Sequence, residues 1–113
     1  MGSGSGLALA VPGARADAAE YGVYYELVRR RIHERLAYPS SARHRALSGT
    51  VEIEVEIAAN GALRRVSLVA SSSHGVLDEA ALDAARGLRR VPFPPDVRPQ
   101  PLRVRLPIVF QLR

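Results

Sequence analysis

The side chains that could support catalysis or metal binding are few in this chain and do not form a recognised pattern. His33, His44 and His74 are the only histidines, and there is no cysteine. Their spacing matches no metal-binding or nucleophile motif, so we interpret each as an ordinary solvated histidine. The absence of cysteine excludes a disulfide and any thiolate metal site.

The carboxylates of Asp78, Glu79 and Asp83 have a simpler explanation than acid–base catalysis. Asp78 and Glu79 open a segment with helical periodicity that ends in arginines, and the helix dipole favours this order of charges. Asp83 is interpreted as an ordinary surface charge of the same segment. The chain also has no glycine-rich phosphate-binding loop. We therefore predict that the protein is not an enzyme and uses no metal or cofactor.

The segment before Tyr38-Pro39 has the spacing of an amphipathic helix. Asp17 and Glu20 resemble a capping box at its start, and the helix should end near Ala37 because a proline restricts the residue before it. Its apolar stripe comprises Tyr21, Tyr24, Tyr25, Val28, Ile32 and Leu36.

Two further helices are expected. Ser40 is placed to cap a short helix through Leu47. A longer helix should run from Leu77 to Arg90. Its predicted core face comprises Leu77, Ala81, Ala84 and Leu88.

Residues 51–57 alternate apolar and acidic side chains, which predicts a strand with one buried face. Asn60-Gly61 then favours a type I′ hairpin turn, in which both residues have positive φ. The return strand should span Leu63 to about Ala70. A bulge near Arg64 would correct the phase of its apolar residues.

The last strand is predicted from Leu102 to Leu112. Its buried face comprises Leu102, Val104, Leu106, Ile108, Phe110 and Leu112. A strand–helix–strand crossover makes the second and third strands parallel, so both can pair antiparallel with the first only if it lies between them. The predicted fold is α+β, with a three-stranded sheet in the order second–first–third and helices packed on one face.

This topology places opposite charges side by side on the wet face of the sheet. The glutamates of residues 52–56 would lie beside Arg65 on one side and beside Arg103 and Arg105 on the other. We expect replacement of Glu54 to change the local charge balance but hardly the stability.

Pro107 lies in the middle of the last strand, which this topology places at a sheet edge. Proline donates no ladder hydrogen bond and is confined to edges and bulges. The backbone on either side of Pro107 is then free to pair with an extended peptide. Arg103 and Arg105 would favour acidic residues in that peptide.

The basic composition raises a nucleic-acid alternative. All 16 basic residues are arginine and the formal net charge is +5. The mixed α/β order loosely resembles an RNA-recognition fold, but glutamates occupy the sheet face on which such folds stack bases, and they would repel phosphate. Nucleic acid is therefore not an expected partner.

The chain divides into a short leader and one domain. Residues 1–6 resemble an expression-tag remnant, residues 7–16 are small and turn-prone and are interpreted as linker, and residues 17–113 form the domain. No segment is long and apolar enough to span a membrane. We expect the chain to be part of a longer protein.

Short segments in a fixed order resemble the carboxy-terminal domain of TonB proteins. None is specific alone, but the ordered set is, and it extends over about residues 21–112. The segments are Tyr38-Pro39, Gly49-Thr50-Val51, Asn60-Gly61, Ser72-Ser73, Leu77-Asp78-Glu79-Ala80-Ala81, Pro92-Phe93-Pro94 and Leu106-Pro107-Ile108-Val109-Phe110. The TolA carboxy-terminal domain, with a related fold and periplasmic role, is the alternative, but the first and fifth segments favour TonB.

The resemblance implies a periplasmic domain of a protein anchored in the inner membrane of a Gram-negative cell. Working with the ExbB–ExbD complex, such proteins couple the proton motive force to outer-membrane transporters, including those for iron or heme uptake. The domain would bind the transporter's TonB box as an added strand. A homodimer, the transporter and its cargo are left open.

The residues expected to bind this peptide form two groups. One is the Tyr-Pro segment, in which Ala37 replaces the Gln of some family members. The other is the last strand. They are Ala37, Tyr38, Pro39, Arg103, Val104, Arg105, Leu106, Pro107, Ile108, Val109, Phe110 and Gln111.

Overall fold

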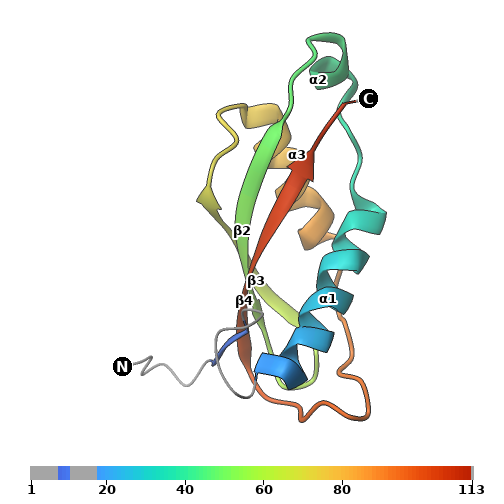
Figure 1. Cartoon of the computed structure of the whole chain (residues 1–113), viewed down its shortest axis with the longest axis vertical. Coiled ribbons are helices and arrows are strands. Elements are labelled where there is room, and N and C mark those ends of the chain that lie inside the picture. Colours follow the sequence, from blue (N-terminus) through green and yellow to red (C-terminus); the bar gives the residue numbers. More distant parts are fainter. Residues whose placement is uncertain (1–7, 11–17, 113) are drawn as a thin grey trace.

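The computed structural model describes residues 8–10 and 18–112 (Figure 1). The elements are β1 (Ala8–Ala10), α1 (Ala18–Arg35), α2 (Ser40–His44), β2 (Gly49–Ile57), β3 (Leu63–Ala70), α3 (Gly75–Arg86) and β4 (Leu102–Phe110). The predicted tag remnant, most of the predicted linker and the predicted capping residue Asp17 lie outside the described residues. No helix in the described part is long and apolar enough to cross a membrane.

The sheet has the strand order β1-β4-β2-β3, and the helices pack against it (Figure 1). β2 lies between β3 and β4 and is antiparallel to both, which confirms the predicted second–first–third order. β1 was not predicted. It lies within the segment interpreted as linker and pairs parallel with Leu102–Val104 at the start of β4.

The core lies between the sheet and the helices. The predicted apolar stripe is buried along α1, but the helix ends at Arg35 rather than near Ala37, and Leu36 just beyond it is half-buried. The four predicted core residues of the α3 segment are all buried, including Leu88 just past the helix end. On β4 the alternate residues from Leu102 to Phe110 are buried, as predicted. Leu112 is exposed instead, because β4 ends at Phe110 and does not carry the alternation further.

The predicted end of α3 is wrong. The helix ends at Arg86, and the chain beyond it turns to join the β2–β3 hairpin. The N–H of Leu63 donates to the Arg89 carbonyl at 3.0 Å, and the N–H of Val91 donates to the Gly61 carbonyl at 2.9 Å. These bonds satisfy backbone groups that a longer helix would have used internally.

The predicted bounds of α2 are also wrong. The helix ends at His44 rather than at Leu47, because Ala46 has φ 56°, which no right-handed helix allows. The capping position belongs to Pro39, with no side-chain capping bond, so Ser40 is the first helical residue.

The hairpin turn differs from the predicted type. Gly61 has φ 87°, but Asn60 does not have positive φ, so the turn is not type I′. The N–H of Gly61 donates to the Ala58 carbonyl at 2.8 Å, and the Asn60 side chain accepts from the N–H of Ala62 at 3.0 Å. Asparagine and glycine therefore still make the turn, with the asparagine acting through its side chain.

β3 is an irregular strand. Its register with β2 shifts between Glu56 and Ile57, which confirms the bulge predicted near Arg64. A second shift lies between Glu52 and Ile53, where Val69 is the extra residue. Bulges of this kind increase the local twist and disrupt pairing at a sheet edge.

Asp78 anchors the loop that joins β3 to α3. Its buried carboxylate accepts hydrogen bonds from the Ser71 hydroxyl at 2.5 Å, the Ser72 hydroxyl at 2.8 Å and the Ser72 N–H at 2.9 Å. Burial alone would raise the pKa of Asp78, but these hydrogen bonds and the nearby His74 hold that pKa below its ordinary value. The predicted first-turn carboxylate thus has a structural role.

We predict that Gly61→Ala strongly destabilises the fold. Gly61 has positive φ, and a Cβ there would lie 2.6 Å from the Val91 carbonyl oxygen. The free energy of unfolding should fall by about 2–3 kcal/mol. Gly22→Ala is the control, because nothing lies within 4 Å of a Cβ at that helical position. It should stabilise by up to about 1 kcal/mol in chemical denaturation, and equal effects of the two changes would contradict the turn geometry.

We predict that Asp78→Asn destabilises the protein and changes its response to acid. The variant should lose about 2 kcal/mol at neutral pH, because one carboxylate oxygen that accepts from the serines becomes an amide nitrogen that cannot accept, and the negative charge is lost. The folded pKa of Asp78 is lowered, so its contribution is present above the unfolded carboxyl pKa and is lost as the pH falls through the folded value. Urea denaturation across pH should therefore show a shallower loss in acid for the variant. Exposed Asp83→Asn, on the same helix, should behave as wild type.

Candidate functional site

The outer side of β4 has an open stretch that fits the predicted peptide site. β2 pairs with β4 along its whole length, whereas β1 covers only Leu102–Val104 on the other side. From Arg105 to Phe110 no strand of the described residues lies on that side. The structure therefore places Arg103 and Val104 beside β1 and the later predicted strand residues at an open edge. Gln111 lies just beyond the strand.

The direction of the backbone groups on β4 follows from Pro107. The register between β2 and β4 is continuous across the Glu52–Pro107 pair, so we infer that the proline nitrogen faces away from β2. Backbone groups alternate in direction along a strand, so those of Arg103, Arg105 and Val109 face the same outer side. Arg105 and Val109 thus present N–H donors at the open edge, with a gap in donors at Pro107.

Tyr38 joins the Tyr-Pro segment to the end of this edge. Its ring packs edge-on against Phe110, the last residue of β4, with ring centres 5.4 Å apart. Its hydroxyl donates to the Leu47 carbonyl, and the Arg43 guanidinium lies 5.8 Å from the ring centre. The two predicted groups of site residues therefore meet at Tyr38 and Phe110.

The position of the Tyr-Pro segment depends on α1. The buried Tyr24 hydroxyl donates to the Val91 carbonyl at 2.5 Å, and its ring stacks on Phe93 at 4.2 Å between centres. Burial raises the pKa of Tyr24. This hydroxyl therefore stays protonated and keeps its bond, fixing α1 against the segment that leads to β4.

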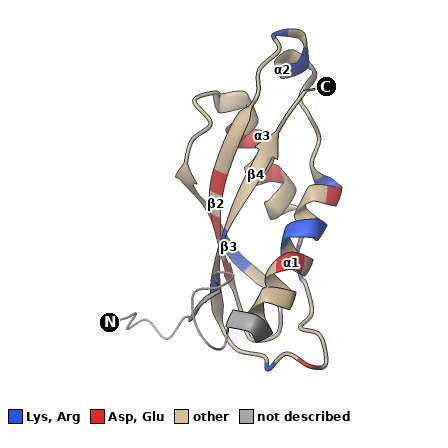
Figure 2. Cartoon of the chain, in the orientation of Figure 1, with Lys and Arg blue, Asp and Glu red and all other residues tan. Residues whose placement is uncertain are grey.

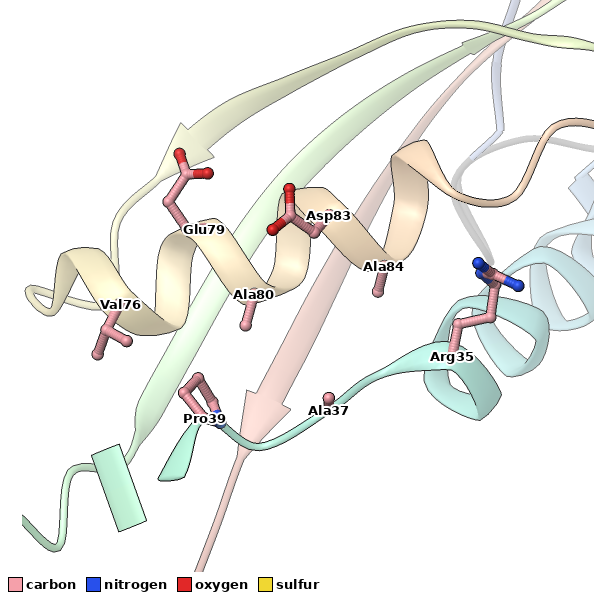
Figure 3. A pocket seen from close by; sticks show the side chains of 8 residues that line it. All are labelled: Arg35, Ala37, Pro39, Val76, Glu79, Ala80, Asp83 and Ala84. Atoms are coloured by element: carbon pink, nitrogen blue, oxygen red, sulfur yellow. The ribbon is translucent and has the colours of Figure 1, made fainter. Parts of the chain in front are cut away.

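Ala37 and Pro39 face a pocket on the helical side of the molecule. The pocket has a volume of about 430 Å³ and lies between residues 35–39 and α3. Figure 3 shows Val76, Ala80 and Ala84 pointing from α3 toward Ala37 and Pro39, while Glu79 and Asp83 point away from them. The pocket lining therefore combines these small apolar side chains with the charged residues Arg35, Glu79 and Asp83. Its residues come from two separate segments, so sequence patterns did not predict it.

The wet face of the sheet is organised around Glu54. Its carboxylate lies 3.0 Å from Arg105 Nε and 3.3 Å from Arg103 Nε, and only 17% of the side chain is exposed. Figure 2 shows the acidic positions on β2, the strand next to β4. The predicted cross-strand charges are confirmed, and Glu56 is likewise opposite both Arg103 and Arg65. Because both strand arginines bind Glu54, they are less available to a peptide than we expected from the sequence.

The remaining residues that could support chemistry are dispersed. Among the described residues, no group of three His, Asp or Glu side chains could hold a metal ion. His33 and His74 are half-buried and His44 is exposed, each on a different element or loop. The geometry gathers backbone groups and small apolar side chains, which suit peptide binding.

A continuous sequence match accompanies this geometry. The family model described as Gram-negative bacterial TonB protein C-terminal matches residues 34–112, from the end of α1 to just past β4. The chain belongs to this family. The match includes both groups of site residues named above.

Two curated TonB proteins are similar to this TonB-type domain. Protein TonB of Haemophilus influenzae is 32% identical over 101 residues, which is 89% of this chain and 37% of that protein. Protein TonB of Vibrio cholerae is 36% identical over 75 residues, or 66% of this chain and 31% of that protein. The chain thus spans about a third of the length of these relatives.

Solved structures share the fold of this TonB-type domain. The Helicobacter pylori TonB carboxy-terminal domain superposes with a TM-score of 0.69 at 24% identity, covering 91% of this chain and 98% of that one. The Pseudomonas aeruginosa domain gives 0.58 at 18% identity, covering 69% and 79%. TolAIII bound to a TolB-derived peptide gives 0.55 at 22% identity, covering 74% and 71%.

The sequence suggested that replacing Glu54, for example by Lys, would hardly change the stability. The structure revises that expectation, because only 17% of the Glu54 side chain is exposed and it pairs with two arginines. We predict that Glu54 contributes more to stability than an exposed glutamate. Glu54→Gln removes the carboxylate from two arginines at a largely covered position and should lower the free energy of unfolding by about 1–2 kcal/mol. Glu54→Lys should lower it further by adding a third cation. The control is Glu26→Gln, which breaks one exposed pair with Arg29 in α1 and should cost under about 0.5 kcal/mol. Equal losses in urea denaturation would contradict a special role for Glu54.

Proposed function

We propose that this domain is the periplasmic part of a TonB-type energy transducer and that it binds the TonB box of an outer-membrane transporter by strand addition. The box would pair with the outer side of β4 and contact the Tyr-Pro segment at the end of that strand. The protein acts in this proposal as a binding module and not as an enzyme. Family membership and the open edge of β4 support it.

The observation that carries the proposal is the difference between the two edges of the sheet. β4 keeps an unshifted register with β2 along nine residue pairs, so its outer backbone groups form a regular row. β3, at the opposite edge, has two register shifts. An added strand needs a regular row of donors and acceptors, and bulges obstruct that pairing.

The chemistry of the β4 edge suits varied peptide sequences. Arg105 and Val109 would donate to the box, and the Pro107 carbonyl would accept from it. Backbone bonds of this kind give affinity without demanding particular side chains. The Val109 side chain is 47% exposed and would add apolar contact. TolAIII, which shares the fold, was solved with a bound peptide, so the fold is compatible with peptide binding.

The wider role extends beyond the residues of this chain. We propose that a membrane anchor elsewhere in the protein works with ExbB–ExbD and transmits the effect of the proton motive force to this domain. Iron or heme uptake is the expected transport process. These assignments follow from the family, and the chain covers only about a third of the curated relatives.

The binding experiment is an NMR titration of labelled domain with TonB-box peptides from transporters of the same organism. The largest amide shifts should appear from Arg105 to Gln111 and around Tyr38. Shifts concentrated on Val66–Ala70 would instead identify β3 as the receiving edge and contradict the proposal.

We predict that Val109→Pro weakens peptide binding about tenfold while the domain stays folded. The substitution removes an outward N–H that the box would use, but it leaves the bonds between β2 and β4 intact. Val109→Thr is the matched control, because it keeps the N–H and alters only an exposed side chain. Unchanged affinity in the proline variant, measured by calorimetry, would show that this edge does not receive the peptide.

A further inference from the structure

The chain's own N-terminal segment lies on the edge assigned to the partner. β1 pairs in parallel with β4, with Ala8 opposite Leu102, Leu9 opposite Arg103 and Ala10 opposite Val104. It therefore covers the first part of the same side of β4 that is open from Arg105 onward. We propose that β1 is a built-in competitor, which must leave the edge before a partner strand can pair along the full length of β4. This inference rests on the proposed function.

The backbone geometry identifies the bonds involved. The backbone groups of Arg103 point to the same side of β4 as those of Pro107, four residues further on, so the Arg103 N–H and carbonyl face outward. In a parallel pair with Leu9 opposite Arg103, the Arg103 N–H donates to the Ala8 carbonyl and its carbonyl accepts from the Ala10 N–H. These are the groups that a partner strand extending to Arg103 would use. Partner and β1 cannot both bond to them.

β1 is suited to being displaced. It has only three residues, and its one sheet neighbour is β4. Short edge strands with so few bonds open locally at far lower free energy than the core. While β1 is paired, a partner strand cannot bond along the full length of β4. The apparent affinity for such a strand is therefore the intrinsic affinity multiplied by the fraction of molecules in which β1 has left the edge. The peptide also meets an edge of limited length, because only Arg105 onward is open for first contact.

The first test needs no ligand. Hydrogen exchange in the whole chain should show a protected Arg103 amide and faster exchange at Arg105 and Val109. Ala10→Pro removes the β1 donor and should raise the Arg103 exchange rate at least about tenfold. Ala10→Ser, which keeps the N–H at the same position, is the matched control and should leave that rate unchanged. An Arg103 amide that exchanges as fast as Arg105 in the wild type would overturn the proposal.

The second test measures competition with a TonB-box peptide. In the wild type, binding should move the Leu9 and Ala10 amide signals to unpaired-chain positions. Ala10→Pro should bind the peptide about fivefold more tightly than wild type, whereas Ala10→Ser, which keeps the N–H, should not. Equal affinities of Ala10→Pro and wild type, or peptide binding that leaves the β1 signals in place, would overturn the proposal.

The two proposals fail in different ways. A peptide that binds neither wild type nor Ala10→Pro at β4 would overturn the proposed function, and with it the competition, even where hydrogen exchange shows β1 on the edge. A peptide that shifts Arg105–Gln111 equally in both proteins would support the proposed function and overturn the competition alone.

Discussion

Every backbone N–H and C=O in a strand needs a hydrogen-bond partner, and β4 pairs with a neighbouring strand along its whole length on only one side. β2 satisfies the inner groups along the whole strand. Water, β1 or another chain must satisfy the outer groups. The features that bear on function follow from this constraint. Pro107 is tolerated because its missing N–H falls on the outer side, and the strand stays regular because β2 pairs with it along its whole length.

The rest of the molecule holds that edge straight and in place. The buried face of β4 packs into the core beneath α1, and Tyr38 holds the far end through Phe110. Glu54 draws Arg103 and Arg105 toward β2, which keeps these long side chains on the sheet face. The edge is thereby presented as a regular, pre-formed row of backbone groups. Pre-organisation of this kind reduces the entropy lost when an extended chain binds.

The sequence predicted the features that depend on periodicity. Alternation along residues 51–57 and 102–110 indicated the strands, and the crossover rule predicted their order, with which Pro107 at a sheet edge is consistent. It did not predict features that depend on contacts between distant segments. α3 ends at Arg86 because the backbone at Arg89 and Val91 forms hydrogen bonds with the β2–β3 hairpin instead of continuing the helix. Helix propensities of the local residues give no sign of this competing interaction. β1 was not predicted because three small or apolar residues are too few to show an alternating pattern. The pocket beside Ala37 arises only when α3 is laid against residues 35–39.

The direction of β4 through the molecule has a mechanical consequence for a strand added to it. The described chain begins at β1, beside the start of β4, and β4 ends at Phe110 near α2, toward the opposite tip of the molecule (Figure 1). A strand added along β4 and pulled along its own axis would load all its hydrogen bonds together in shear. The same strand pulled sideways would lose them one at a time, as a zipper opens. A peptide added in this way would therefore resist a force applied along β4 and would separate from β4 more readily under a force applied across the sheet.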